Sequence, residues 1–230
     1  MSTTIALVLY PGLTPLDLIG PLQVVSTLAR LRPEFRPIVV AERPGEVIGD
    51  DGLTFVTDAA FVDAPHPNVL VVPGGGKPTL EAMSHEPLRA YVRQAAGTAD
   101  LVTTVCTGAL IVAATGLLNG RDATTHWAYR GILEHYGARY RRRRWVEDGP
   151  FLMSAGVSAG IDTALRLVAR LTDDTTARAV QRAMDYDPRP PFGGLDYDRM
   201  PLLARAMGTM HALLAPRITR RARRLIAEGR

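Results

Sequence analysis

Residues 101–114 constrain the fold of this chain more than any other stretch. They begin as the apolar, β-branched run Leu-Val-Thr-Thr-Val, pass through Cys106, Thr107 and Gly108, and continue as an Ala/Leu-rich segment of helical length. A strand that turns sharply into a helix holds the residue at the bend above the carboxyl end of a sheet, where helix amides face developing negative charge. Cys106, the only cysteine, is therefore a candidate nucleophile. The alternative is a buried cysteine that acts as a small hydrophobic residue.

The rest of the chain alternates between strand-like and helix-like segments. Strands are predicted over residues 4–10, 35–41, 53–57, 68–73, 101–105, 140–147 and 151–154. Helices are predicted over residues 22–31, 79–96, 128–136 and 155–171, from residue 172 onward, and over 201–228. The second of these helices is expected to break near residues 84–87, and the last to be interrupted at Pro216. This alternation predicts an α/β fold: a doubly wound, mostly parallel sheet with helices on both faces. No linker or repeat interrupts it, so residues 1–230 are expected to form one domain, with 195–230 as a helical, basic C-terminal extension.

Three features follow predicted strands at their carboxyl ends, where such sheets bind ligands. They are Asp17 after the first strand, the run Gly74–Gly76 after residues 68–73, and Cys106. Separately, Asp17 could be a helix cap and the glycine run a plain turn. Together they form a constellation that indicates a site.

This constellation permits nucleophilic chemistry. A helix N-terminus can lower the pKa of a thiol, and a nearby carboxyl group such as Asp17 can serve as a general acid. The amides of Gly75, Gly76 and Thr107 are candidates to stabilise an anion on a substrate attached to sulfur. A cysteine paired with a carboxyl group suits addition to an electrophilic carbon better than peptide hydrolysis.

Three further residues are candidates to contact the substrate. His126 either contacts the site or has a structural role, which is the favoured interpretation. Trp127 beside it, and Phe192, are candidates for the pocket walls.

Composition excludes several classes of protein. The chain is 47% hydrophobic and 22% charged, so it has enough apolar material for a core. Its net charge is +4, and almost all of its positively charged residues are arginines. The N-terminus lacks the features of a signal peptide, and the longest apolar stretch is too short to span a bilayer. A cytoplasmic location without membrane association is therefore expected. No motif indicates a metal or cofactor. The basic end, residues 217–230, predicts a surface helix or tail, and nucleic acid is not an expected partner.

Several motifs are similar to those of a known family. They are Tyr10-Pro-Gly-Leu-Thr-Pro-Leu-Asp-Leu-Ile-Gly-Pro21, Val72-Pro-Gly-Gly-Gly76, Val105-Cys-Thr-Gly-Ala109, Ala123-Thr-Thr-His-Trp127, Ser154-Ala-Gly-Val-Ser-Ala-Gly-Ile-Asp162 and Tyr186-Asp-Pro-Arg-Pro-Pro-Phe192. They resemble the PfpI-like branch of the class I glutamine amidotransferase-like superfamily and, within it, the isonitrile (isocyanide) hydratases.

The resemblance implies a flavodoxin-like fold and a homodimer with sites near its interface. It also implies hydration of a small electrophile, an isonitrile, to an N-substituted formamide without a cofactor. In this comparison Cys106 attacks the isonitrile carbon, Asp17 transfers a proton and Thr107 contacts the nucleophile. Water then hydrolyses a covalent thioimidate.

The same motifs occur in the sensor domains of AraC-type transcription regulators. The alternative to an enzyme is therefore a non-catalytic or redox-sensing module, because an exposed cysteine of low pKa also suits an oxidation sensor. Such regulators carry a helix-turn-helix domain of about a hundred residues, for which this chain has no room. A threonine, Thr107, follows the cysteine where many protease-type members have histidine, which counts against a peptidase.

Overall fold

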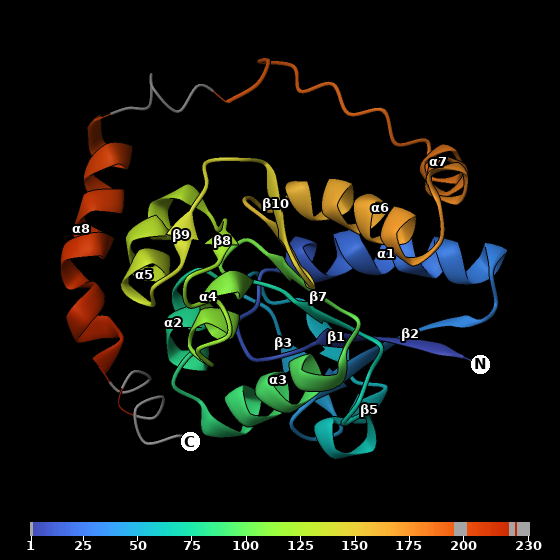
Figure 1. Ribbon diagram of the computed structural model, residues 1–230, viewed down its shortest axis with the longest axis horizontal. Coiled ribbons are helices and arrows are strands. Elements are labelled where there is room, and N and C mark those ends of the chain that lie inside the picture. Colours follow the sequence, from blue (N-terminus) through green and yellow to red (C-terminus); the bar gives the residue numbers. More distant parts are fainter. Residues whose placement is uncertain (1, 196–201, 221–223, 225–230) are drawn as a thin grey trace.

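A seven-stranded sheet forms the centre of the molecule in the computed structural model, which describes residues 2–195, 202–220 and 224 (Figure 1). Its strands are β1 (Thr3–Val8), β2 (Phe35–Ala41), β5 (Ala59–Ala60), β6 (Val69–Val72), β7 (Leu101–Val105), β10 (Trp145–Asp148) and β11 (Phe151–Ser154). They lie in the order β10-β11-β7-β6-β1-β2-β5, and only the β10–β11 pair is antiparallel. The predicted mostly parallel sheet is confirmed.

Two short sheets flank the main one. One pairs β3 (Glu46–Ile48) with β4 (Thr54–Val56), and the other pairs β8 (Asp122–Ala123) with β9 (Arg139–Tyr140). The β3–β4 hairpin reaches back to the loop after β1, where the Gly12 amide donates to the Ile48 carbonyl at 2.8 Å. This hairpin therefore lies beside the segment that carries Asp17.

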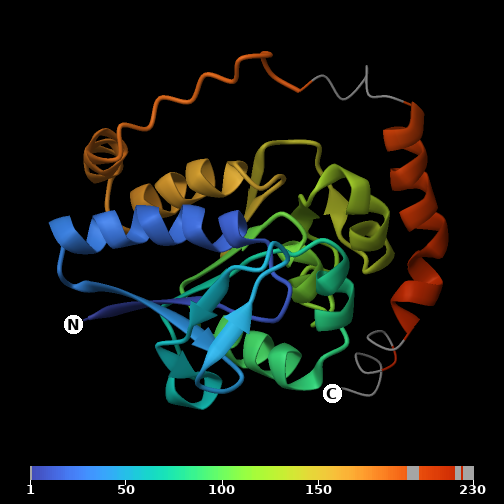
Figure 2. The same ribbon diagram turned by 180° about the vertical axis from the view of Figure 1, so that it is seen from behind.

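Helices cover both faces of the sheet (Figures 1 and 2). They are α1 (Pro15–Leu31), α2 (Lys77–Ala82), α3 (Glu86–Thr98), α4 (Gly108–Ala113), α5 (Arg130–His135), α6 (Ala159–Leu171), α7 (Asp174–Ala183) and α8 (Leu202–Ile218), with 3₁₀ turns η1 (Phe61–Asp63) and η2 (Trp127–Tyr129). The pair α1 and α6 packs on one face with α7 beside it, and α3 lies on the other face next to α4. Helix α8 packs against α5 and η2. The doubly wound architecture is confirmed.

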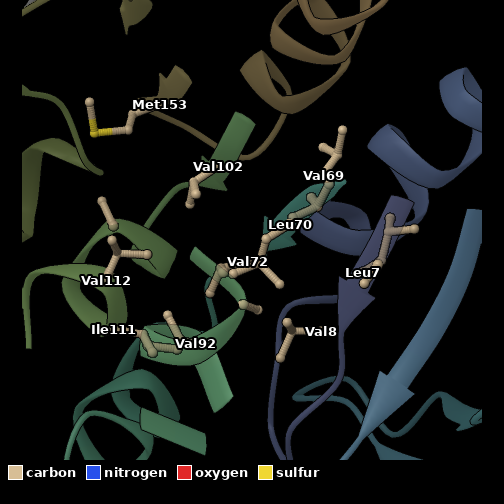
Figure 3. Packing of buried hydrophobic residues seen from close by; sticks show 14 of the residues in the cluster. Leu7, Val8, Val69, Leu70, Val72, Val92, Val102, Ile111, Val112 and Met153 are labelled. Carbon is tan, nitrogen blue, oxygen red and sulfur yellow. The ribbon is translucent and has the colours of Figure 1, made fainter. Parts of the chain in front are cut away.

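The core explains why the strands lack polar alternation. Every residue of β6 and β7 is buried, since each strand is covered on both faces by helices. In Figure 3, Leu70, Val72 and Val102 of the sheet lie near Val92 of α3 and Ile111 of α4. The helices are thereby fixed against the strands whose carboxyl ends carry the candidate site.

Two details differ from the sequence prediction. Residues 140–147 do not form one strand, because the segment between β9 and β10 is held by ion pairs of Arg141 with Asp122 and of Arg144 with Asp162. Helix α8 is not interrupted at Pro216, which lies within its last turn, so the helix continues two residues beyond this proline. The strand predicted over residues 53–57 is found as β4, paired with β3 in a hairpin, and the break predicted near residues 84–87 separates α2 from α3.

The chain's single-domain organisation and its C-terminal extension stay predictions. Part of the basic end, residues 221–223 and 225–230, and the start of the extension at 196–201 lie outside the described residues. In the described part of the chain, no helix combines the length and the apolar character needed to cross a bilayer.

We predict that Gly108→Ala destabilises the protein by at least about 2 kcal/mol, as overpacking of a rigid contact does. A Cβ at Gly108 would lie 2.1 Å from the Val72 carbonyl oxygen, which is backbone that cannot move without disturbing β6. The matched control is Gly97→Ala in α3, where a Cβ meets nothing within 4 Å and the free energy of unfolding should be unchanged or rise by up to about 1 kcal/mol. Equal denaturation midpoints for both variants would contradict the close helix–strand contact.

Candidate active site

Cys106 lies at the bend between β7 and α4. Its φ is 54°, in the left-handed region that residues with a Cβ seldom adopt. Its amide donates to the Ser154 carbonyl at 3.2 Å, and its carbonyl accepts a hydrogen bond of 2.9 Å from the Thr125 hydroxyl. These bonds from β11 and from the loop after β8 hold the strained residue in place. Thr125 was not among the predicted site residues, although it lies beside His126 in the motif Ala123–Trp127.

Asp17 lies in the first turn of α1 and is fully buried. Its Oδ2 accepts a hydrogen bond of 3.0 Å from the Gly74 amide, and Thr14 three residues earlier donates its own amide to the Gly74 carbonyl at 2.8 Å. The start of α1 is thus tied to the glycine run from both directions. A Cβ at Gly74 would lie 2.8 Å from Asp17 Oδ2 and 2.5 Å from Thr107 Oγ1, so only glycine allows this approach.

The carboxyl group of Asp17 is poised between its two protonation states. Burial raises its pKa to about 7, against the opposing effects of the Gly74 amide and the Cys106 thiol. Its second oxygen, Oδ1, accepts no hydrogen bond of normal geometry within the described residues, although the Cys106 thiol lies close enough to affect the carboxyl pKa. A carboxyl with one free oxygen beside a thiol can hold a proton there at neutral pH.

The Cys106 thiol differs from the sequence expectation. Burial raises its pKa, and the negative charge of Asp17 raises it further, whereas a hydrogen bond from the Thr107 amide lowers it by less. The expected depression by a helix N-terminus is therefore wrong for the unliganded chain. The reason is that Cys106, 6% exposed, is removed from water and lies beside a carboxyl group. The resting pair is a thiol next to Asp17 rather than a free thiolate.

The glycine run supports Thr107 instead of offering free amides. The Gly75 and Gly76 amides both donate to Thr107 Oγ1, at 3.0 and 3.2 Å. In the unliganded chain the threonine hydroxyl that follows the cysteine thus occupies both amides, and their contact with a substrate anion stays a prediction. Gly75 and Gly76 act on the site by fixing Thr107.

A chain of buried hydroxyls continues from Thr107 to Thr79 and Tyr10. The Thr107 and Thr79 hydroxyls are 2.8 Å apart, those of Thr79 and Tyr10 are 3.0 Å apart, and Tyr10 donates to the Pro73 carbonyl at 3.0 Å. Since two amides already use the lone pairs of Thr107 Oγ1, its proton points to Thr79, whose own proton points to Tyr10. The orientation of Thr107 is thereby fixed. Neither Tyr10 nor Thr79 was singled out in the sequence, because their link exists only in the folded chain.

His126 caps the 3₁₀ turn η2. Its Nδ1 accepts a hydrogen bond of 3.3 Å from the Ala128 amide, which requires an unprotonated Nδ1. Burial lowers the pKa of the imidazole, and His211 lowers it further. This geometry agrees with the favoured structural role. The Trp127 ring lies 5.2 Å from that of His126, and Phe192 is 98% exposed, so Phe192 lines no pocket of its own chain.

Two of the remaining motifs meet away from Cys106. The Tyr186 hydroxyl donates to Asp162 Oδ1 at 3.0 Å, and Arg144 pairs with the other oxygen of Asp162. This contact joins α6 to the segment after α7. Among the described residues, no three His, Cys, Asp or Glu side chains gather in a way that would hold a metal ion. The chemistry available at the bend is that of a thiol, a carboxyl group and a fixed threonine.

Comparison with known proteins identifies the family. A family model described as the DJ-1/PfpI family matches residues 3–170. The chain belongs to this family. A crystal structure of a THiJ/PfpI family protein from Pseudomonas syringae has a TM-score of 0.83 and 36% sequence identity, and covers 98% of this chain and 91% of that one. The flavodoxin-like fold of DJ-1/PfpI proteins and the resemblance to the PfpI-like branch are thereby confirmed.

Two named relatives represent the two functional alternatives. Isonitrile hydratase of Pseudomonas putida is 37% identical over 201 residues, which are 87% of this chain and 86% of that protein. The HTH-type transcriptional regulator CdhR of Pseudomonas aeruginosa is 28% identical over 173 residues, which are 74% of this chain and 51% of the regulator. The chain therefore matches the hydratase over nearly its whole length and about half of the regulator.

We predict that Asp17→Asn removes a pH dependence of stability. A buried carboxyl with a pKa of about 7, against about 3.9 when unfolded, keeps its proton more tightly in the folded state. Folding stability is therefore full below about pH 4 and falls by up to roughly 4 kcal/mol as the pH rises through 7. Asparagine mimics the protonated carboxyl, so the free energy of unfolding of the variant minus that of wild type should grow from pH 4 to pH 8.

Urea denaturation at a series of pH values measures this difference. The control is Asp100→Asn, the same chemical change at an exposed residue near the amino end of β7. A difference between Asp17→Asn and wild type that stays constant with pH would contradict a raised pKa at Asp17.

Proposed function

We propose that this DJ-1/PfpI protein is an isonitrile hydratase that converts an isonitrile into an N-substituted formamide. The observation that carries the proposal is the Cys106 thiol at the strained bend, next to the buried Asp17 carboxyl whose Oδ1 is free. The relative from Pseudomonas putida supports the choice of substrate class. The reaction adds water without a change in redox state, so a thiol and a carboxyl group suffice and no cofactor is proposed.

The proposed reaction has two stages. In the first, Cys106 Sγ bonds to the terminal carbon of R–N≡C, the thiol proton passes to Asp17, and the same carboxyl delivers a proton to that carbon. The product is a thioimidate, R–N=CH–S–Cys106. In the second stage water adds to the carbon, the nitrogen gains a proton, and the C–S bond breaks. Sulfur regains its proton, and the formamide R–NH–CHO leaves.

The electrostatics of the pair suit this proton transfer. A group that both accepts and donates a proton works best when its pKa lies near the operating pH, and burial raises the pKa of Asp17 to about 7. Because the pKa of the thiol is raised, it holds its proton until the substrate arrives, and Asp17 can take it as sulfur attacks. Thr107, fixed by two glycine amides, is the next residue in the chain, and its amide lowers the pKa of the Cys106 thiol.

The redox-sensing alternative has less support. Oxidation by peroxide follows thiolate character and exposure, and Cys106 is 6% exposed with a raised pKa. The related regulator also has a second half that this chain does not match. We therefore propose a small-molecule electrophile as the substrate. The cytoplasm is the proposed location.

We further propose a homodimer formed through an apolar patch beside the site. Leu16 and Ile19 of α1 are exposed, as are Ile48, Leu53 and Val56 of the β3–β4 hairpin. The hairpin is tied to the start of α1 by hydrogen bonds of Asp50 with Leu13 and Thr14. The exposed residues thus extend over two neighbouring elements, next to Asp17. Exposed large apolar side chains on neighbouring elements indicate a protein interface, and a second copy is the occupant that the resemblance implies.

Turnover of a simple alkyl isonitrile, cyclohexyl isonitrile, tests the reaction. Wild type should release the formamide, Cys106→Ala should release none, and Asp17→Asn should lose about 10²- to 10⁴-fold in kcat, the usual contribution of acid–base catalysis. Formamide is followed by mass spectrometry, and Asp100→Asn serves as the matched charge-removing control with wild-type activity. No formamide from wild type, or equal formamide from Cys106→Ala, would rule out the proposal.

Sedimentation of two α1 variants tests the dimer. Leu16→Lys should shift the protein to monomer, because it places a charge in the apolar patch. Leu31→Lys, at the far end of the same helix and about equally exposed, should leave the dimer intact. Wild type that sediments as a monomer, or two variants that behave alike, would contradict an interface at this end of α1.

A further inference from the structure

Helix α8 has no part in the chemistry described above, yet it contacts the site region. It lies alongside α5 at the edge of the molecule (Figure 2) and also packs against η2. From α8, His211 Nδ1 lies 2.8 Å from the Ala128 carbonyl oxygen, which can only accept, so Nδ1 donates. The His211 ring stacks on the Tyr129 ring, with centroids 4.5 Å apart and planes 20° apart. Helix α8 therefore holds Ala128 and Tyr129 of η2 in place through His211.

Tyr129 is held from two sides. The His126 ring contacts the Tyr129 ring edge-on, with centroids 6.0 Å apart, whereas the His211 ring stacks on it. Ala128, the residue before Tyr129, donates its backbone N–H to His126 and accepts a hydrogen bond from His211 with its carbonyl oxygen. Both imidazoles are thus oriented by the backbone of one residue, and they hold the phenol ring of Tyr129 from two sides.

The hydroxyl of Tyr129 lies against the glycine run that holds Thr107. Its oxygen lies 3.7 Å from the position that a Cβ on Gly76 would take, above the residue whose amide binds Thr107. Within the described part of the chain, no hydrogen bond from this hydroxyl is formed. Burial raises the pKa of Tyr129 and a charge on Cys106 raises it further, so the phenol keeps its proton at neutral pH and can donate it.

We propose that Tyr129 is a further substrate-contacting residue, whose O–H donates a hydrogen bond to the substrate nitrogen, and that His211 of α8 is its positioning residue. The inference rests on the proposed hydratase function. When the thioimidate R–N=CH–S–Cys106 forms, its nitrogen carries a basic lone pair. Water adds to the neighbouring carbon only as that nitrogen gains positive character. A donor at the nitrogen therefore assists the second stage more than the first.

The substitution Tyr129→Phe isolates the hydroxyl, since it keeps the ring that stacks on His211. We expect kcat to fall about tenfold to a hundredfold, the loss of one hydrogen bond to a group that becomes charged. Hydrolysis should become slower than thioimidate formation. Intact-protein mass spectrometry during turnover should then show Cys106 carrying the added mass of the whole isonitrile, at a higher occupancy than in wild type.

Variants of α8 test the positioning role. His211→Ala should accumulate the same adduct, because the ring of Tyr129 loses its stacking partner. His211→Phe, which restores an aromatic ring, should recover most of the wild-type kcat. The matched control is Leu213→Ala, an exposed residue of the same helix, which should behave as wild type.

The outcomes separate this inference from the proposed function. If wild type turns over the isonitrile and Tyr129→Phe has the same kcat and adduct occupancy, the role of Tyr129 is overturned and the hydratase function stands. If wild type forms neither formamide nor adduct, the hydratase function itself fails. An adduct that accumulates in Tyr129→Phe and His211→Ala but not in Leu213→Ala supports the proposal, and thermal denaturation confirms that each variant is folded.

Discussion

The left-handed backbone of Cys106 is the constraint on which the rest of the site depends. A residue with a Cβ in this conformation costs on the order of 1–3 kcal/mol and persists only when its surroundings hold it. Here β11 binds the Cys106 amide, the Thr125 hydroxyl binds its carbonyl, and Gly108 packs directly on the Val72 carbonyl. The bend thus requires glycine at 108 and a hydroxyl at 125. It places the thiol beside Asp17 of α1.

Burial of the Asp17 carboxyl group is a second unfavourable feature of the site. A fully buried carboxyl group is stable in neutral form or with a strong donor, and Asp17 has one amide donor for Oδ2 and none of normal geometry for Oδ1 among the described residues. The result is a pKa of about 7 and a thiol whose own pKa is raised by the neighbouring charge. One pair of side chains therefore accounts both for an unreactive resting thiol and for the ready transfer of its proton.

The convergence of Asp17, the glycine run and Cys106 was predictable, because residues at the carboxyl ends of neighbouring parallel strands meet at one edge of the sheet. The partners of these residues were not. The amides of Gly75 and Gly76 bind Thr107 rather than an anion, a pairing across about thirty residues that no local pattern encodes. The direction of the Cys106 pKa shift was also missed, since it depends on burial, which overrides the effect of a six-residue helix.

Helix α8 contacts the site region from outside the residues that the DJ-1/PfpI family model matches. The DJ-1/PfpI match ends at residue 170, whereas His211 lies about forty residues later and stacks on Tyr129, inside the matched region. This stack holds the ring whose hydroxyl lies against Gly76, whereas Cys106 and Asp17 are held by other contacts. In the proposed reaction α8 therefore acts on the thiol–carboxyl pair only indirectly, through the position of the Tyr129 hydroxyl.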